Sequence, residues 1–475
     1  MFLEFVNKLQ PEKKPPGKMG ASLILMTPNQ IRLKAKYPFR LLRAFKFRKH
    51  NYQYTEAYKN GWDGYISFAH MLNDGAIVIP TGLYPYLKQF VDVEIDYPEL
   101  ELQERFPSKI KMRDYQKLAV NNMIKHKRGI VQLATGAGKT FIALEFIRRV
   151  KGSTIFIVNR KDLLIQTIEK AKEFGFKNIG VIGAGEFQPT YDFDVAMIQT
   201  LNRIDDPEFF EKYDILIIDE CHQLNFNSKV NKKTIAKFRN AWFRFGLSAT
   251  PFRYDLKYAD DITLVGLIGF PVFVMKEIEG FTAPVEVRFL PITYTNKKGF
   301  RSGIYLAYGG YRERVNIIKS IPQRIKLIKA LVEKHKEDKV LIIAPSVAHA
   351  KTIAEHLGDG VIHVSGKLKK KTRKERYLQF REKPKAKCVA TTVYDEGVDF
   401  PDLDVIIFTE PFKSYLKVIQ RVGRGRRLAD GKDKVIVYDL ADDLFPAQNR
   451  ERETHYKKEG FSIKVLHPVN ITLDY

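Results

Sequence analysis

A glycine-rich stretch at residues 133–140 contains the residue types that bind phosphate. It reads Leu-Ala-Thr-Gly-Ala-Gly-Lys-Thr and lies between the aliphatic run 129–133 and the helical run 141–150. In such a turn at the start of a helix, backbone N–H groups bind phosphate oxygens, the lysine reaches the β and γ phosphates, and the final hydroxyl binds Mg²⁺. The usual pattern has glycine where this chain has Leu133, but the flanking strand and helix support the same interpretation. The expected phosphate-binding residues are Thr135, Gly136, Ala137, Gly138, Lys139 and Thr140.

Two adjacent acids, Asp219 and Glu220, directly follow the aliphatic run 215–218, which predicts a buried strand. Carboxylates at the carboxyl end of a strand in the same sheet as a phosphate loop can divide the chemistry. Asp219 would bind Mg²⁺ together with Thr140, and Glu220 would position and polarise the attacking water. An acidic pair at this place is otherwise a solvated edge or a helix cap. Combined with Lys139, we interpret it as catalytic.

Further along the chain, Arg424 and Arg427 are three residues apart and share one face if their segment is helical. Guanidinium groups stabilise the charge that develops on a transferred γ-phosphate. The alternative is a basic helix that faces solvent or nucleic acid. If the pair is catalytic, a second domain must close over the nucleotide.

Arg113 and Gln116 precede the phosphate loop by about twenty residues. An amide both donates and accepts hydrogen bonds at the adenine edge, so Gln116 favours ATP over GTP. A lone glutamine is otherwise an ordinary surface residue. We expect both residues to contribute to nucleotide binding.

The elements that must position these residues alternate between short aliphatic strands and helices from residue 110 onward. This alternation is typical of βαβ units and predicts an α/β fold with two tandem parallel-sheet domains. Short alternating segments before residue 105 predict a small α+β accessory domain at the amino terminus. The apolar segment 254–281 fits either the end of the first α/β domain or a hinge. The predicted domains are 1–105, 106–283 and 284–450, with a carboxyl-terminal extension at 451–475.

The composition favours a globular protein that binds a polyanion. Hydrophobic residues make up 44% of the chain, which excludes a disordered protein. Lys and Arg number 80 against 55 Asp and Glu, so the formal net charge is +25. Such an excess is typical of nucleic-acid binding, although it also promotes solubility. Two cysteines exclude a disulfide framework, and no apolar run approaches membrane-spanning length, so we expect a cytoplasmic protein, of a bacterial host if phage-encoded, with no membrane partner.

Basic and aromatic residues alternate in the first domain. The aromatic rings could stack on bases. A period of two is also typical of the buried side of a strand, and we favour burial for Phe45 and Phe47. The expected nucleic-acid contacts in this domain are Arg40, Arg43, Lys46, Arg48 and Lys49.

The ordered set of motifs resembles superfamily 2 helicases, in the DEAH/DECH-like branch that also includes restriction-enzyme motors and XPB-like DNA helicases. The resemblance covers about residues 110–430, with a DECH box at 219–222. It implies two RecA-like domains with ATP and Mg²⁺ in the cleft between them. By this likeness His222, Ser248 and Thr250 couple hydrolysis to nucleic-acid binding, and Gly397, Asp399 and Gln420 belong to the nucleotide site. The positions that resemble strand-contacting motifs are Asn159, Arg160, Gln199, Thr200, Ser346, Ser365, Gly366, Thr391 and Thr392.

The amino-terminal domain has a likeness of its own. Residues 58–64, followed by residues 80–83, are similar to the accessory domain of phage UvsW-type helicases, which remodel branched DNA. The resemblance therefore implies a monomeric ATP-dependent DNA helicase or translocase with 3′ to 5′ movement. It would unwind or branch-migrate forked DNA in replication, recombination and repair. The alternatives are an RNA helicase, a double-strand translocase of a restriction-type system, and a non-catalytic nucleic-acid clamp.

Overall fold

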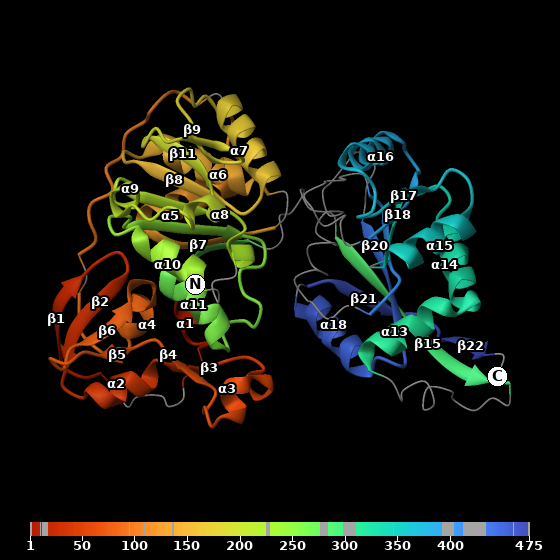
Figure 1. The fold of residues 1–475 in the computed structure, drawn as a ribbon, viewed down its shortest axis with the longest axis horizontal. Coiled ribbons are helices and arrows are strands. Elements are labelled where there is room, and N and C mark those ends of the chain that lie inside the picture. The colour runs from red at the N-terminus through yellow and green to blue at the C-terminus, as the bar shows by residue number, and fades with distance from the viewer. Residues whose placement is uncertain are drawn as a thin grey trace. The chain divides into compact units, whose positions relative to one another are not determined.

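The computed structural model describes residues 2–9, 11, 18–94, 96–108, 110–134, 137–224, 229–275, 284–297, 310–344, 346–391, 403–411, 434–458 and 460–473. The chain divides into two compact units, Met1–Lys276 and Glu277–Tyr475 (Figure 1). Some residues of the predicted sites lie outside the described residues: Thr135, Gly136, Thr392, Gly397, Asp399, Gln420, Arg424 and Arg427.

The larger part of the first unit is built on an eight-stranded sheet with strand order β10-β9-β11-β8-β12-β13-β7-β14. Its strand pairs are parallel except for β10 with β9. The central strands are wholly buried, as expected where helices cover both faces of a parallel sheet. The strands are β7 (Arg128–Leu133), β8 (Thr154–Val158), β9 (Gly180–Gly183), β10 (Glu186–Gln188), β11 (Phe193–Met197), β12 (Ile215–Ile218), β13 (Phe243–Ser248) and β14 (Pro271–Met275). The helices are α5 (Asp114–His126), α6 (Lys139–Arg149), α7 (Lys161–Phe174), α8 (Ile198–Leu201), α9 (Pro207–Glu211), η3 (Cys221–Leu224), α10 (Lys229–Lys237) and α11 (Ala259–Leu267).

The structure decides the place of most of the ambiguous segment 254–281. Its residues form α11 and then β14, which pairs in parallel with β7. Most of α11 and the first three residues of β14 are buried, because these apolar side chains extend the core of the first sheet. Up to residue 275 the segment therefore belongs to the first α/β domain rather than to a hinge.

The second unit contains another parallel sheet, with order β17-β18-β16-β19-β20-β15-β21 and with β22 also paired to β15. The predicted α/β class with two tandem parallel sheets is confirmed. The strands are β15 (Val285–Asn296), β16 (Val340–Ile343), β17 (Ile362–Val364), β18 (Lys387–Ala390), β19 (Val405–Phe408), β20 (Val435–Asp442), β21 (Ser462–Val465) and β22 (Val469–Leu473). The helices are α13 (Tyr311–Ser320), α14 (Pro322–Lys334), α15 (Val347–Leu357), α16 (Lys370–Glu382) and α18 (Pro446–Lys458).

The carboxyl-terminal residues are part of this second sheet. The proposed boundary between residues 450 and 451 falls within α18, and both β21 and β22 lie beyond it. The twelve-residue strand β15 accommodates them in succession, β21 along its first half and β22 along its last residues. The extension is therefore integrated with the domain that precedes it.

The amino-terminal region of the first unit has the predicted α+β composition. Four antiparallel strands follow the order β1-β2-β6-β5, and a separate pair joins β3 to β4. Its strands are β1 (Ala21–Met26), β2 (Gln30–Ala35), β3 (Lys46–Arg48), β4 (Tyr65–Ser67), β5 (His70–Met71) and β6 (Ile77–Pro80). Its helical segments are α1 (Phe2–Val6), α2 (Pro38–Ala44), η1 (Tyr52–Tyr54), α3 (Glu56–Lys59), η2 (Thr81–Leu83) and α4 (Tyr84–Leu87).

The accessory region packs directly on the first α/β domain, and one hydrophobic cluster runs through both (Figure 1). A Cβ at Gly82 would lie 1.9 Å from the carbonyl oxygen of Val265, so only glycine allows this approach of the two backbones. Buried Arg128 donates to the carbonyl of Pro28 at 3.0 Å and to that of Ile268 at 2.8 Å. The accessory region is therefore a fixed part of the first unit.

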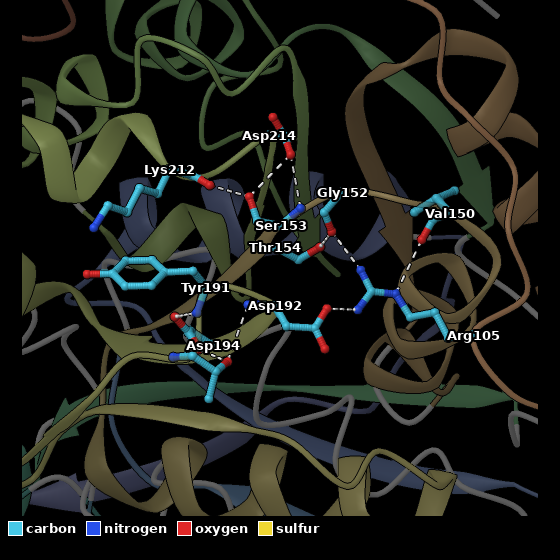
Figure 2. A network of polar contacts seen from close by, with 11 residues as sticks. Arg105, Val150, Gly152, Ser153, Thr154, Tyr191, Asp192, Asp194, Lys212 and Asp214 are labelled. Carbon is cyan, nitrogen blue, oxygen red and sulfur yellow. Dashed lines mark hydrogen bonds and ion pairs between the residues drawn. The ribbon is translucent and has the colours of Figure 1, made fainter.

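The connecting segment before α5 is fixed at the amino ends of the strands. Leu102 forms a bridge with Val150, and Arg105 donates to the carbonyl of Gly152 at 2.6 Å (Figure 2). The Arg105 guanidinium also forms an ion pair with Asp192, which lies just before β11. This polar network fastens the connector to the edge of the sheet where β8 and β11 begin.

Candidate nucleotide site and nucleic-acid interface

The order of the central strands brings three motifs to one edge of the first sheet. β13 lies between β12 and β7, with Ser248 opposite Gln132 and Gly246 opposite Ile218. Because these strands are parallel, the residues that follow their carboxyl ends share one edge. The phosphate loop, the acidic pair and the Ser248–Thr250 segment therefore lie side by side.

The described part of the phosphate loop has the geometry of an anion site at the start of α6. Gly138 caps this helix with φ 82°, and a Cβ there would lie 2.5 Å from Nε2 of Gln116. Glycine is therefore required at this position. Lys139 is only 8% exposed, and it lies at the positive end of the α6 dipole. Thr140 follows it in the first turn of the helix.

Gln116 ties the predicted base-binding segment to the phosphate loop. Its Oε1 accepts from the backbone N–H of Arg113 at 2.9 Å, and its Nε2 donates to the carbonyl of Ala137 at 3.2 Å. The Tyr115 hydroxyl donates to the same carbonyl at 2.9 Å. An amide has two N–H donors and two acceptor lone pairs, so half of its capacity remains for an adenine edge. The glutamine is buried, unlike an ordinary surface residue.

Asp219 is a buried carboxylate that fits a bound cation. It is 7% exposed, and its Oδ1 accepts from the backbone N–H of Glu220 at 3.0 Å. Burial, and then the neighbouring charge of Glu220, raise the pKa of Asp219 to about 6. A divalent cation would reverse this effect because it stabilises the ionised carboxylate. One carboxylate and the Thr140 hydroxyl are ligands that Mg²⁺ can complete with water and nucleotide phosphates.

Glu220 turns the chain from β12 into η3 with an unusual backbone conformation. Its φ is 44°, in the left-handed region that non-glycine residues seldom adopt, and such residues cluster at active sites. Its Oε1 lies 3.6 Å from Nζ of Lys139. The predicted catalytic glutamate and the phosphate-binding lysine are thus brought together.

A chain of polar contacts runs from Glu220 to the Ser248–Thr250 segment. The Nδ1 atom of buried His222 lies 2.8 Å from Oγ of Ser248 and 3.3 Å from Oε2 of Glu220. Burial lowers the pKa of His222 below its ordinary value, which favours the neutral ring. Ser248 Oγ also accepts from the N–H of Thr250 at 3.0 Å. A displacement at Thr250 can therefore reach Glu220 through two side chains.

Sequence reasoning missed three residues that support these motifs. Gln132 Nε2 donates to the carbonyl of Ala249 at 3.2 Å, and Gln223 accepts from Nδ2 of Asn159 at 2.7 Å. The third is Tyr115, at the phosphate loop. Only Gln132 left a sequence signal, as a polar residue within the aliphatic run 129–133.

The predicted strand-contacting residues also follow the carboxyl ends of strands. After β8, the carbonyl of Asn159 accepts from Nε2 of Gln199 at 2.8 Å, whereas the Arg160 guanidinium pairs with Asp162. Thr200 lies beside Gln199 in α8. In the second unit, Ser346 caps α15. Ser365 and Gly366 follow β17, and Thr391 follows the neighbouring strand β18.

Three of these motif residues have a buried polar atom without a hydrogen-bond partner among the described residues. They are Asn159 Oδ1, Thr250 Oγ1 and Thr391 Oγ1. A buried polar group without a partner costs about 1 to 3 kcal/mol, so native structures rarely retain it without a reason. Their place at the two carboxyl edges is what a ligand-binding surface requires.

The basic residues of the accessory region surround β3. Arg40, Arg43 and Arg48 are exposed, while Lys46 and Lys49 are half-buried. The Arg48 guanidinium lies 5.1 Å from the ring centroid of Tyr52 and 4.8 Å from that of Tyr65. We call these five basic residues the basic face.

The aromatic residues near the basic face divide into two groups. Phe45 and Phe47 are fully buried, so the burial that we favoured for them is confirmed. These two rings are therefore not available to stack on bases. Their rings pack against Tyr86 at centroid distances of 5.1 and 5.9 Å, in the accessory core. Phe39 and Tyr54 are 65% and 85% exposed and present flat surfaces to solvent.

Among the residues that the structure describes, no helix is both long and apolar enough to cross a membrane.

Comparisons with known proteins agree with this arrangement. Residues 109–253 match the family described as type III restriction enzyme, res subunit, and residues 323–429 match the helicase conserved C-terminal domain. The chain is 28% identical over 412 residues to the DNA 3'-5' translocase XPB2 of Sulfurisphaera tokodaii, covering 77% of this chain and 91% of that protein. It is 25% identical over 441 residues to the ATP-dependent DNA helicase uvsW of Enterobacteria phage T4, covering 84% of this chain and 85% of that one.

Solved structures show the same fold. A fragment of a putative HsdR subunit of a type I restriction enzyme from Vibrio vulnificus has a TM-score of 0.56 and 20% identity. The match covers 77% of this chain and 70% of the fragment.

Proposed function

We propose that this chain, which belongs to the superfamily 2 helicases related to the UvsW, XPB and restriction-enzyme motors, translocates on DNA and remodels forked or branched DNA. It is an ATP-driven helicase with two RecA-like domains. The names of its relatives support DNA as the partner, with expected 3′ to 5′ movement. The observation that carries the proposal is the basic face, which lies in the same compact unit as the phosphate loop and the acidic pair. Roles in replication, recombination and repair follow from that substrate.

The chemistry assigned to the first unit is ATP hydrolysis. Lys139 and the N-terminus of α6 bind the phosphates, and Gln116 with Arg113 contacts the base. Glu220 positions the attacking water and takes up its proton as the water oxygen bonds to the γ-phosphorus and the bond to the bridging oxygen breaks, so that ADP leaves. Asp219 and Thr140 would hold Mg²⁺, which when bound neutralises charge on the phosphates.

The second RecA-like domain completes the site in this proposal. Arg424 and Arg427 would stabilise the transition-state charge on the γ-phosphate when the domains close. Gly397, Asp399 and Gln420 would contact the nucleotide from the same side. In this proposal residues 106–283 form the first motor domain and residues 284–450, together with the integrated residues 451–475, form the second. The accessory domain 1–105 precedes them.

The DNA strand would pass over the carboxyl edges of both sheets. Amide, hydroxyl and backbone groups at Asn159, Gln199, Ser346, Ser365 and Thr391 suit phosphate contacts, which position a strand without reading its sequence. The accessory domain would grip the duplex ahead of that strand through the basic face. Exposed rings such as Phe39 and Tyr54 can add base stacking where the strands separate.

One experiment tests the function directly. ATP-dependent processing of a fork, a four-way junction and a plain tailed duplex is measured side by side, with Lys139→Ala as the inactive control. We expect the fork and the junction to be processed faster than the tailed duplex. Equal rates on all three would refute the branched-DNA preference.

The alternatives give different outcomes in matched assays. Stronger stimulation of ATP hydrolysis by single-stranded RNA than by forked DNA would identify an RNA helicase. Displacement of a third strand from triplex DNA without strand separation on forks would identify a double-strand translocase. The non-catalytic clamp is set aside because the chain is an ATP-driven enzyme.

The basic face has a test of its own. We expect Arg48→Ala combined with Lys49→Ala to weaken DNA binding and to flatten its salt dependence, by about 0.9 in the logarithmic slope for each phosphate that is no longer neutralised. Lys88→Ala is the matched control, an exposed cation at the carboxyl end of α4 in the same domain. Fluorescence anisotropy from 50 to 200 mM salt measures both, and an unchanged slope would remove the basic face from the DNA interface.

A further inference from the structure

The loop at residues 251–256 joins the Ser248–Thr250 segment to the residues before α11. Two consecutive residues of this loop, Asp255 and Leu256, have φ of 55° and 64°. These are left-handed conformations that residues other than glycine rarely adopt, so the surrounding structure must hold them.

Asp261 of α11 holds this loop in shape. It is 5% exposed, and its carboxylate accepts from the backbone N–H groups of Arg253 at 2.9 Å, Tyr254 at 2.7 Å and Leu256 at 3.1 Å. Three bonds to one carboxylate fix the loop as a single body. A displacement of the loop would therefore also displace Thr250, which directly precedes it.

The accessory domain contacts this loop through a histidine. The His50 ring stacks on Tyr254 with centroids 3.9 Å apart and an interplanar angle of 21°, and it meets the ring of Tyr258 edge-on at 5.0 Å. The backbone N–H of His50 donates to Oδ2 of Asp260 at 3.1 Å. His50 directly follows Arg48 and Lys49 of the basic face.

A second contact comes from the amino-terminal helix and its following turn. Nζ of Lys8 lies 3.5 Å from Oδ1 of Asp255, and the rings of Phe5 and Phe252 are 6.4 Å apart. The loop is thus held between α11 and two parts of the accessory domain.

The charge of Arg253, in the same loop, acts on both His222 and His50. Burial lowers the pKa of His222, opposed by Glu220 and reinforced first by Lys139 and then by Arg253. Burial also lowers the pKa of His50, opposed by Asp260 and reinforced by Arg253. The Arg253 charge therefore influences the pKa of a histidine at the nucleotide site and of a histidine at the contact with the accessory domain.

We propose that the His50–Tyr254 stack is a positioning contact that links DNA binding at the basic face to ATP hydrolysis at Glu220. The path runs from Lys49 and His50 through the loop to Thr250, then through Ser248 and His222 to the glutamate. DNA that shifts the basic face would move the loop and so change the place of Glu220 relative to the phosphate loop. This inference rests on the proposed function, because it requires the basic face to bind DNA.

The test compares hydrolysis with and without forked DNA. For His50→Ala and for Tyr254→Leu we expect the stimulation by DNA to fall roughly 5- to 20-fold, at the lower end of ordinary coupling between sites. The hydrolysis rate without DNA and the dissociation constant for DNA should each stay within about 2-fold. His50→Phe keeps a stacking ring and the backbone bond to Asp260, so it should retain the stimulation.

A double-mutant cycle separates coupling from general damage. If the two side chains act through one contact, the combined variant should lose no more stimulation than either single variant. Additive losses, or full stimulation in both single variants, would overturn the inference while leaving the proposed function intact. A wild-type enzyme that forked DNA does not stimulate would instead refute the proposed function.

Discussion

Two buried aspartates in the first sheet have opposite surroundings. Asp194 lies near the amino end of β11 and accepts four hydrogen bonds, from the N–H and hydroxyl of Thr190, the N–H of Tyr191 and the hydroxyl of Tyr213, at 2.6 to 3.1 Å. Figure 2 shows it within the network that also holds the connector. Asp219 lies beyond the carboxyl end of β12, accepts from Glu220 at 3.0 Å, and has a raised pKa of about 6.

The difference separates an acid that stabilises the fold from the acid that we propose takes part in the chemistry. At the amino edge the protein itself supplies the donors that a buried carboxylate needs. At the carboxyl edge, burial and the charge of Glu220 raise the pKa of Asp219, and the buried oxygens Asn159 Oδ1 and Thr250 Oγ1 have no hydrogen-bond partner among the described residues. Departures from full satisfaction of polar groups are expected at functional sites, where stability is given up for chemistry.

Glu220→Gln should have the largest effect. The amide keeps the size of the side chain but cannot take up a proton from water, so we expect kcat for ATP hydrolysis to fall by about 10² to 10⁴. Nucleotide and DNA binding should persist. Steady-state hydrolysis with forked DNA measures the loss, and Glu173→Gln, on the exposed face of α7, is the control. A loss of less than tenfold would assign the base role to another residue.

Asp194→Asn should destabilise the first unit by about 2 to 4 kcal/mol. The amide nitrogen would face donors that now meet a charged acceptor, and bonds to charged groups contribute more than neutral ones. Urea unfolding measures the change against Glu186→Gln on the exposed strand β10. An unchanged free energy of unfolding would mean that water replaces the carboxylate as the hydrogen-bond acceptor.

Asp219→Asn should change the free energy of unfolding in the opposite direction and stabilise the protein. Because the folded pKa is raised from 3.8 to about 6, the native state binds the extra proton between these values, and stability falls as the pH rises through that window. Removal of the carboxylate should therefore stabilise the nucleotide-free protein above pH 6, by at most about 3 kcal/mol.

Thermal melts of Asp219→Asn and the wild type at pH 5 and pH 8 test this sign. The difference in melting temperature should grow with pH. A larger gain at the lower pH would contradict the assignment of the titration to Asp219.

Arg105→Ala should have the smallest effect, a destabilisation of about 1 to 2 kcal/mol, because its hydrogen bonds to the connector's neighbours are removed. The kcat for hydrolysis should not change, because the residue lies at the amino edge. Arg105→Lys should give an intermediate destabilisation, since it keeps the charge near Asp192 but not the fork of donors. A changed kcat would show that the two edges are not independent.

Most of the fold could be predicted from the sequence because its strands are short aliphatic runs at regular spacing. In the two α/β domains the strands β9, β10, β14, β21 and β22 were not predicted. Gly180–Gly183 and Glu186–Gln188 lack an apolar pattern, and β21 is largely exposed. In β22 buried residues alternate with exposed ones, but the strand has only five residues. Their pairing depends on neighbours distant in the chain, which local patterns do not encode.

The sequence by itself determined the helicase family and predicted the chemistry, because the lysine expected to bind phosphate and the acidic pair are each part of a local motif. Only the tertiary structure decided that Asp194 accepts four hydrogen bonds whereas burial and Glu220 raise the pKa of Asp219, since both acids lie beside aliphatic runs. It also decided that His50 stacks on Tyr254, more than two hundred residues away. The physical reason is that burial and hydrogen-bond partners arise from strand order, and strand order is set by packing of the whole sheet.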